Sequence, residues 1–325
     1  MTLGGRTALT AIENHGRIVV EDDILKYGAF NGTGPAQNSN FAGAAFNSLS
    51  FSCTPIELLS NDGTDTVLGS ATGFFWKKDG QPYLVTNWHV VSGRSPFSKK
   101  LGENGFIPRR MFFYSISISE NNGIISIERR RWLFRWGDDM EEILSSPPQF
   151  NGKPLDIWGT PIPREIVFGK DPNRSGFKSA PDISCFVNEN ATSRIVTNVG
   201  DDCFILGYPI RNYDGAMPPI WKRGSISSET ILDVSGHPIF LIDAATTSGM
   251  SGSPIIRKLT TLVADNRDID ALQEYSNFEV IGVYSGRLQG SKLAEINIGY
   301  GWHRTMIDEA LNHYKWSKPE VTYNP

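Results

Sequence analysis

The sequence predicts an all-β protein. From Phe51 onward, short apolar runs alternate with turns that are rich in Gly, Pro and Asn. Several of these runs alternate apolar and polar residues, which is the period of a half-buried strand. The dipeptides Asp79-Gly80 and Asn122-Gly123 each separate two such runs, as in a tight β-hairpin. Many short strands at this spacing indicate a barrel or a sandwich.

The composition limits the class of protein. Of the 325 residues, 39% are hydrophobic and 20% are charged, so one large domain or two smaller ones can form a substantial core. The net charge of −4 argues against a nucleic-acid partner. Three cysteines are too few, and odd in number, for a disulfide framework, so we expect reduced thiols in a cytoplasmic protein. The sequence has neither an apolar run of about 18 residues nor an apolar leader, so we expect no membrane span and no signal peptide.

The first half of the chain combines a loop-like start with a β-rich region. Residues 1–50 are expected to form an N-terminal extension. Residues 51–200 are expected to form a first β-domain, with strands at 56–59, 66–71, 111–118 and 124–127 and in both arms of the hairpin at Asp79-Gly80. Prolines interrupt the strand pattern between residues 135 and 180, and we interpret that stretch as an insertion.

Residues 201–325 are expected to form a second β-domain. Six strand-like runs occur there, at 203–207, 226–231, 239–244, 254–256, 278–284 and 296–300. In the segment 304–314 the apolar residues recur at helical spacing. This spacing predicts an amphipathic C-terminal helix.

One turn between two of these strands carries a chemical signal. It places Ser251 between glycines in the order Gly-x-Ser-Gly-x-Pro, from Gly249 to Pro254. Glycine adopts backbone conformations that other residues resist, so such a turn can present a hydroxyl in a cleft. The N–H groups of Gly249 and Ser251 can then converge on one point, as an oxyanion hole requires.

A histidine and an aspartate suited to activate this hydroxyl lie upstream. His89 follows the second arm of the predicted hairpin. Two aspartates open short apolar runs, Asp182 before Ile-Ser-Cys and Asp156 between Leu and Ile. A hydroxyl, an imidazole and a carboxylate are the groups that serine nucleophiles use.

These motifs resemble those of the chymotrypsin-fold serine peptidases, and most closely the HtrA-like, trypsin-like members without disulfides. The family signature has a hairpin running into Thr-Asn-x-His-Val, then an aspartate before a hydrophobic run, then Asp-Ala-Ala-x-x-x-Gly-x-Ser-Gly-x-Pro. The first and third motifs occur as written, around His89 and Ser251, while the run after Asp182 matches more loosely. The resemblance covers about residues 60–310. It implies two six-stranded antiparallel β-barrels followed by a C-terminal α-helix, and we expect no PDZ-like domain after that helix.

The resemblance also implies an activity. Ser251 would be the nucleophile, His89 the general base, and Asp182 the acid that orients the imidazole. We favour Asp182 over Asp156 because its distance to the element Leu206-Gly207-Tyr208-Pro209 fits the family better. The chain is therefore predicted to be a serine endopeptidase that cleaves a protein or peptide substrate through an acyl-enzyme, with no cofactor and no metal.

The resemblance further places a pocket for the substrate side chain next to the cleaved bond. The residues assigned to substrate binding are Ala245, Thr246, Tyr284, Ser285, Gly286, Ile298 and Gly299. The floor, near residues 245–248, has no acidic residue to pair with Lys or Arg, so small or medium neutral side chains are expected. In trypsin-type zymogens, an aspartate just before the nucleophile pairs with the ammonium group that trimming of the chain creates. Met250 stands at that position here, and its side chain cannot accept such an ion pair. Control is therefore expected from loops or from a regulatory protein partner.

Other functions compete with this interpretation. A catalytically inactive binding module on the same fold is the main alternative, because one fold hosts many functions. An α/β-hydrolase esterase needs Gly-x-Ser-x-Gly, but Ser253 takes the place of the final glycine, and the order of its triad is opposite. A metal enzyme is disfavoured, since the five histidines show no ligand spacing.

Overall fold

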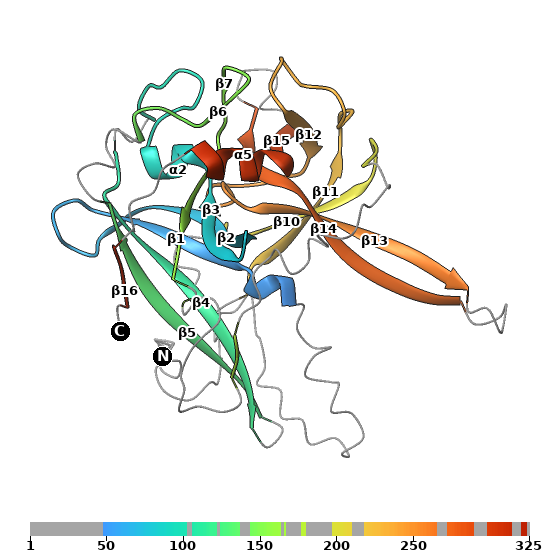
Figure 1. Cartoon of the computed structure of the whole chain (residues 1–325), viewed down its shortest axis with the longest axis horizontal. Coiled ribbons are helices and arrows are strands. Elements are labelled where there is room, and N and C mark those ends of the chain that lie inside the picture. Colours follow the sequence, from blue (N-terminus) through green and yellow to red (C-terminus); the bar gives the residue numbers. More distant parts are fainter. Residues whose placement is uncertain are drawn as a thin grey trace, which may run out of the picture.

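The computed structural model describes most of the chain from residue 48 onward. The described residues are 48–102, 106–121, 124–136, 144–163, 166, 177–179, 197–209, 218–264, 272–288, 298–313 and 320–323. They form mainly antiparallel strands in two large sheets, with few helices (Figure 1). This architecture matches a chymotrypsin-like double barrel and confirms the predicted fold class. The predicted extension at residues 1–50 lies almost entirely outside the described residues.

The first sheet is a half-barrel with the strand order β16-β5-β4-β1-β2-β3-β8, and β9 pairs with β4. Its strands are β1 (Cys53–Leu59), β2 (Val67–Lys78), β3 (Gln81–Thr86), β4 (Arg110–Asn121), β5 (Ile124–Arg135), β8 (Trp158–Pro161), β9 (Phe177–Ser179) and β16 (Glu320–Tyr323). Within the described residues this path stays open, whereas the family resemblance implies a closed six-stranded barrel. The edge of β5 is occupied by β16, so a C-terminal segment of the chain completes the sheet that begins near the N-terminus.

Both hairpins predicted from two-residue turns are confirmed. Asp79 and Gly80 connect β2 to β3 with φ of 50° and 77°. A type I′ turn requires such left-handed values at both central positions. In the second hairpin β4 ends at Asn121 and β5 begins at Ile124, and these two residues are paired.

The second sheet closes into a barrel, in the order β10-β11-β12-β15-β14-β13, with β13 pairing back onto β10. Its strands are β10 (Asp202–Gly207), β11 (Ile220–Ile226), β12 (Ile239–Asp243), β13 (Pro254–Ala264), β14 (Leu272–Arg287) and β15 (Ile298–His303). Beyond the barrel, β13 and β14 continue as a long two-stranded arm (Figure 1).

One of the six predicted strands of this barrel lies elsewhere than expected. The run 226–231 was predicted as a strand, but β11 ends at Ile226. The following segment leads to an exposed turn in which Ile231 is 79% and Leu232 is 59% exposed. The strand was predicted because the run contains apolar residues, but two of the apolar residues in this segment lie exposed in a turn.

The two sheets share one hydrophobic core cluster with helix α5 (Thr305–His313). Its buried members include Phe74, Trp76, Leu206, Val283, Trp302, Met306, Ile307 and Leu311. These residues come from β2, β10, β14, β15 and α5, so the helix packs its apolar face where both sheets contribute side chains. The predicted C-terminal amphipathic helix is confirmed. None of the helices in the described residues combines the length and the apolar character that crossing a bilayer requires.

The proline-rich stretch contributes a strand to the first sheet. After the small hairpin of β6 (Gln149–Phe150) and β7 (Lys153–Pro154), the chain enters β8, which pairs with β3. Pro154 of β7 and Pro161 of β8 lie in strands at the edges of their sheets, where a missing N–H is tolerated. The described part of residues 135–180 thus includes a strand of the first sheet, and the interpretation of the whole stretch as an insertion stays a prediction.

Replacing Leu311 with alanine is expected to lower the free energy of unfolding by about 2–5 kcal/mol. The side chain is 4% exposed, and its Cδ2 atom would lie 2.3 Å from a Cβ placed on Gly159 of β8, so α5 is closely packed on the first sheet. Urea denaturation measures the change. The control Glu309→Ala, on the exposed face of the same helix, is expected to change it by less than about 0.5 kcal/mol. An equal effect of both substitutions would contradict this docking of the helix.

Candidate active site

The serine turn (residues 249–253) lies between β12 and β13 and depends on two glycines. Gly249 and Gly252, on either side of Ser251, have φ of 94° and 85°, which residues with side chains rarely adopt. A Cβ on Gly249 would lie 2.3 Å from the carbonyl oxygen of Tyr208. A Cβ on Gly252 would lie 2.2 Å from the carbonyl oxygen of Thr72. The motif therefore requires both glycines for backbone conformation and for space.

Thr72 of β2 fixes this turn to the first sheet. Its N–H donates to the carbonyl oxygen of Ser251 at 2.9 Å. Its hydroxyl donates to the carbonyl oxygen of Gly249 at 2.8 Å and accepts the N–H of Tyr208 at 2.9 Å. Because Thr72 is fully buried, these bonds are shielded from water. The turn that carries Ser251 is thus held by the sheet that carries His89.

Two backbone N–H groups of the serine turn are available to a ligand. The N–H groups of Met250, Gly252 and Ser253 donate to carbonyl oxygens of the protein. Those of Gly249 and Ser251 donate to no acceptor within the residues that the structure describes. They are the two donors predicted for the oxyanion hole, and such preorganised donors stabilise negative charge on a carbonyl oxygen.

His89 lies in the short helix α2 (Trp88–Ser92), which follows β3. Trp88 and Val91 are buried in the core of the first sheet and anchor the helix. Gly93 ends it with a φ of 66°, and its N–H bonds to the carbonyl oxygen of His89 at 3.0 Å. The side chain of His89 is 30% exposed. The helix therefore leaves part of the imidazole exposed while its neighbours Trp88 and Val91 stay in the core.

Asp156 contacts His89 at two points. Its Oδ2 lies 2.7 Å from the ring Nδ1, and its Oδ1 accepts the backbone N–H of His89 at 2.8 Å. The carboxylate is fully buried, so these donors replace the water that it has lost. The side-chain amide of Asn87 donates to the carbonyl oxygen of Asp156 at 2.7 Å and fixes the backbone there. With the Nδ1 proton directed at Asp156, the neutral ring has Nε2 as its acceptor.

Ser285 of β14 links the acid to the serine turn. Its hydroxyl donates to Oδ2 of Asp156, and its carbonyl oxygen accepts the hydroxyl of Ser251 at 3.4 Å. The sequence assigned Ser285 to the substrate pocket. Nothing in the local sequence indicated its contact with the acid, because that contact joins residues of different sheets.

The acid assignment made from sequence is corrected by this geometry. Asp182 was favoured, but the carboxylate that binds Nδ1 of His89 belongs to Asp156, the alternative. Asp182 itself lies outside the described residues. Sequence distance to a later family element misled the choice. The signal that favoured Asp156 was its place between Leu155 and Ile157, both of which are fully buried.

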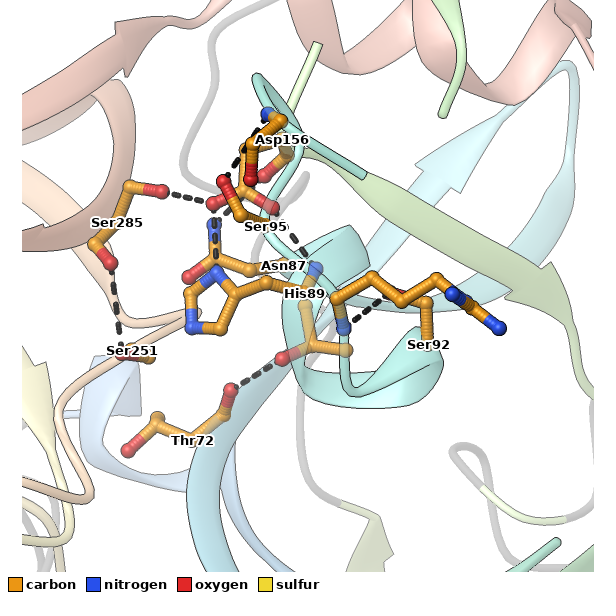
Figure 2. A network of polar contacts seen from close by, with 11 residues as sticks. Thr72, Asn87, His89, Ser92, Ser95, Asp156, Ser251 and Ser285 are labelled. Atoms are coloured by element: carbon orange, nitrogen blue, oxygen red, sulfur yellow. Dashed lines mark hydrogen bonds and ion pairs between the residues drawn. The ribbon is translucent and has the colours of Figure 1, made fainter. Parts of the chain in front are cut away.

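Figure 2 shows the ring of His89 between Asp156 and Ser251, with its second nitrogen on the side of Ser251. Among the described residues, the hydroxyl of Ser251 donates to the carbonyl oxygen of Ser285 rather than to the ring. Rotation about the single χ1 torsion of a serine redirects its hydroxyl between staggered positions. The arrangement therefore brings together a hydroxyl, an oriented imidazole and a buried carboxylate.

The pKa of His89 is raised above its ordinary value of 6.5. Burial acts to lower it, because a low dielectric disfavours the charged imidazolium. The negative charge of Asp156 and its hydrogen bond to the ring outweigh that effect and stabilise the charged form. His89 is consequently a stronger base than a free imidazole, which favours removal of a proton from a hydroxyl.

The predicted substrate-binding residues lie on neighbouring segments. Tyr284, Ser285 and Gly286 are on β14, Ile298 and Gly299 begin the paired strand β15, and Ala245 and Thr246 precede the serine turn. The hydroxyls of Thr246 and Tyr284 are hydrogen-bonded, and both side chains are buried. Met250 is buried in the core of the second barrel, where its side chain offers no partner for an ammonium group.

Comparisons with known proteins concern the fold alone. No protein-family model matches the sequence, and no curated protein matches it. A crystal structure of the Rv3671c protease in an inactive form is similar, with 16% identity and a TM-score of 0.41 over 87% of this chain and 97% of that chain. A serine-to-alanine mutant of Rv3671c from M. tuberculosis H37Rv is 16% identical, with a TM-score of 0.34 over 86% of this chain and 92% of that chain. The site assignments therefore rest on the contacts described above.

Asp156→Asn is expected to lower the pKa of His89, because it removes the charge that raises it. Two-dimensional NMR of the ring protons against pH measures this value, which should lie above 6.5 in the wild type. Since the folded-state pKa is the higher one, the pair adds stability that is complete below the ordinary value and is lost as the pH rises through the folded-state value. Asp182→Asn should leave the titration unchanged. The opposite pattern would return the orienting role to Asp182.

Proposed function

We propose that this protein is a serine endopeptidase that cleaves protein or peptide substrates through an acyl-enzyme intermediate. The observation that carries the proposal is the 2.7 Å contact between the buried carboxylate of Asp156 and Nδ1 of His89. It supplies a base of fixed tautomer whose second nitrogen lies on the side of Ser251 (Figure 2). The N–H groups of Gly249 and Ser251, which have no acceptor among the described residues, would supply the matching anion site.

In the proposed first step, Nε2 of His89 accepts the hydroxyl proton of Ser251 while Oγ attacks the substrate carbonyl carbon. A C–O bond forms, and the carbonyl π electrons move onto the oxygen. The N–H groups of Gly249 and Ser251 stabilise that oxyanion. Asp156 stabilises the imidazolium without taking its proton. Collapse breaks the C–N bond, and the imidazolium gives its proton to the leaving amine.

In the second step, water takes the place of the amine. His89 accepts a proton from the water molecule as its oxygen attacks the acyl carbon. The bond to Oγ of Ser251 then breaks, and Oγ recovers a proton from His89. One peptide bond and one water molecule are converted into a carboxylic acid and an amine, and the three side chains return to their starting states.

A catalytically inactive binding module on the same fold is the second candidate. The observation in its favour is the hydroxyl of Ser251, which donates to Ser285 instead of His89. At 3.4 Å this bond is longer than a normal O–H···O bond and is therefore weak. Little free energy is needed to redirect the hydroxyl to the ring, which makes the enzyme the stronger proposal.

We also propose that the protein is an HtrA-like peptidase of the cytoplasm, where its thiols stay reduced. We further propose that its loops or a protein partner control its activity. Cys53 and Cys203 are buried free thiols. Burial raises the pKa of both, and at Cys203 the charge of Asp202 adds to the effect and brings the pKa to about 12. Thiols with such pKa values react slowly. These cysteines support a fold that requires no disulfide.

Ser251→Ala is expected to abolish labelling by a fluorophosphonate probe and hydrolysis of casein, because both need the activated hydroxyl. Labelling is read by mass spectrometry of the intact protein. Ser98→Ala, which alters an exposed serine outside the serine turn and the predicted pocket, is the control and should retain both activities. A folded wild-type protein that is not labelled would favour the binding module.

Asp156→Asn is expected to reduce kcat by about 10⁴-fold with a much smaller change in KM, because the ring loses its tautomer and orientation while the substrate site persists. Steady-state hydrolysis of a peptide substrate measures both constants. Asp182→Asn should behave like the wild type. A comparable loss of kcat in Asp182→Asn alone would show that Asp156 is not the orienting acid.

A further inference from the structure

The side chain of Tyr284 lies where a substrate side chain is expected. Tyr284 is on β14 and is 1% exposed, and its hydroxyl bonds to the hydroxyl of Thr246. On the other side, a Cβ placed on Gly299 of β15 would lie 2.7 Å from Cε2 of Tyr284 and 2.9 Å from its hydroxyl oxygen. The ring therefore fills the space between the segment before the serine turn and the start of β15.

Backbone bonds place this residue next to the serine turn. The N–H of Gly252 donates to the carbonyl oxygen of Tyr284 at 2.9 Å, and the N–H of Tyr284 donates to the carbonyl oxygen of Ser253 at 2.8 Å. The next carbonyl oxygen along β14, that of Ser285, accepts the hydroxyl of Ser251. A substrate residue whose carbonyl carbon meets Ser251 therefore lies beside this part of β14, and the pocket predicted for its side chain includes Tyr284 and Thr246.

The surroundings of Gly286 and Gly299, on either strand beside this space, differ in how closely they are packed. Around Gly286, on β14, a Cβ would meet no heavy atom within 4 Å among the described residues. Around Gly299 a Cβ would collide with the ring of Tyr284. Ala245, at the start of the segment before the turn, is exposed, whereas Thr246 is 4% exposed. Room for added atoms is therefore present at Gly286 and absent at Gly299.

The ring is held in place by packing and by its hydroxyl. Tyr284 belongs to the core cluster of the second barrel, together with Ala244 and Met250. Burial raises the pKa of its hydroxyl, while the bond to Thr246 and the charge of Arg287 act against that rise. The phenol is therefore neutral and can donate a hydrogen bond. Displacing the ring to admit a large side chain would break this bond and open the core.

We infer that Tyr284 restricts this protein to substrates with a small residue, glycine, alanine or serine, on the acyl side of the cleaved bond. The inference rests on the proposed function and adds its substrate class. A methyl or hydroxymethyl group needs only the open space at Gly286, whereas an aromatic or long aliphatic group that reaches the level of Gly299 must displace the ring. The hydroxyl pair of Tyr284 and Thr246 carries no charge, so it offers no counter-ion to a Lys or Arg side chain.

Peptidyl phosphonates with one defined side chain at this position test the inference, since they bond covalently to an activated serine. We expect the wild type to react at least about tenfold faster with an alanyl than with a phenylalanyl phosphonate, as is typical of discrimination by pocket size. A fluorophosphonate without a peptide is measured in parallel. Failure of the fluorophosphonate to label Ser251 rejects the proposed function. Labelling by it, combined with an alanyl rate no higher than the phenylalanyl rate, rejects the inference alone.

Two variants test whether the ring of Tyr284 causes the preference for a small side chain. Tyr284→Val empties the space and should raise the phenylalanyl rate relative to the alanyl rate by at least about tenfold. Tyr284→Phe keeps the ring, removes the hydroxyl and should retain the wild-type preference. Thermal melting establishes that each variant is folded. If Tyr284→Val does not fold, the wild-type ratio and Tyr284→Phe still decide the matter, because a Tyr284→Phe protein that prefers the phenylalanyl phosphonate would show that ring volume does not set the limit.

Discussion

The buried carboxylate of Asp156 is the constraint on which the arrangement of the site depends. A charge removed from water is costly unless hydrogen-bond donors surround it. Two of its donors come from the ring and backbone of His89, and a third is the hydroxyl of Ser285. His89 lies on a helix of the first sheet, and Ser285 lies on a strand of the second. The hydrogen bonds that this one carboxylate accepts therefore hold parts of both sheets at the same point.

A second connection between the sheets passes through Thr72. The serine turn belongs to the second barrel by its strands, yet two of its carbonyl oxygens accept bonds from a buried residue of β2. The apolar cluster that both sheets share, which includes Trp302 and buried residues of α5, adds packing between the two sheets. Precision at the site thus depends on contacts between segments that are far apart in the sequence, as preorganised donors and bases require.

Strand geometry explains how β14 serves two purposes with adjacent residues. Successive side chains of a strand point to opposite faces. Ser285 is directed to Asp156, and Tyr284 is directed to Thr246 inside the second barrel. The same strand thereby supports the base on one face and limits the room for a substrate side chain on the other. A change in the position of β14 is expected to affect both together.

The sequence by itself determined those features that local chemistry controls. Left-handed positions required the glycines at 80, 249 and 252, alternation revealed many of the strands, and helical spacing revealed α5. It could not decide which aspartate meets His89, because Asp156 and Asp182 both open apolar runs and separation along a chain does not give distance in space. The pairing of β8 with β3 made that decision by carrying Asp156 beside α2. Likewise only the tertiary structure directed Tyr284 onto Thr246 and Gly299, since those three residues meet through the pairing of β15 with both β12 and β14 and not through any local pattern.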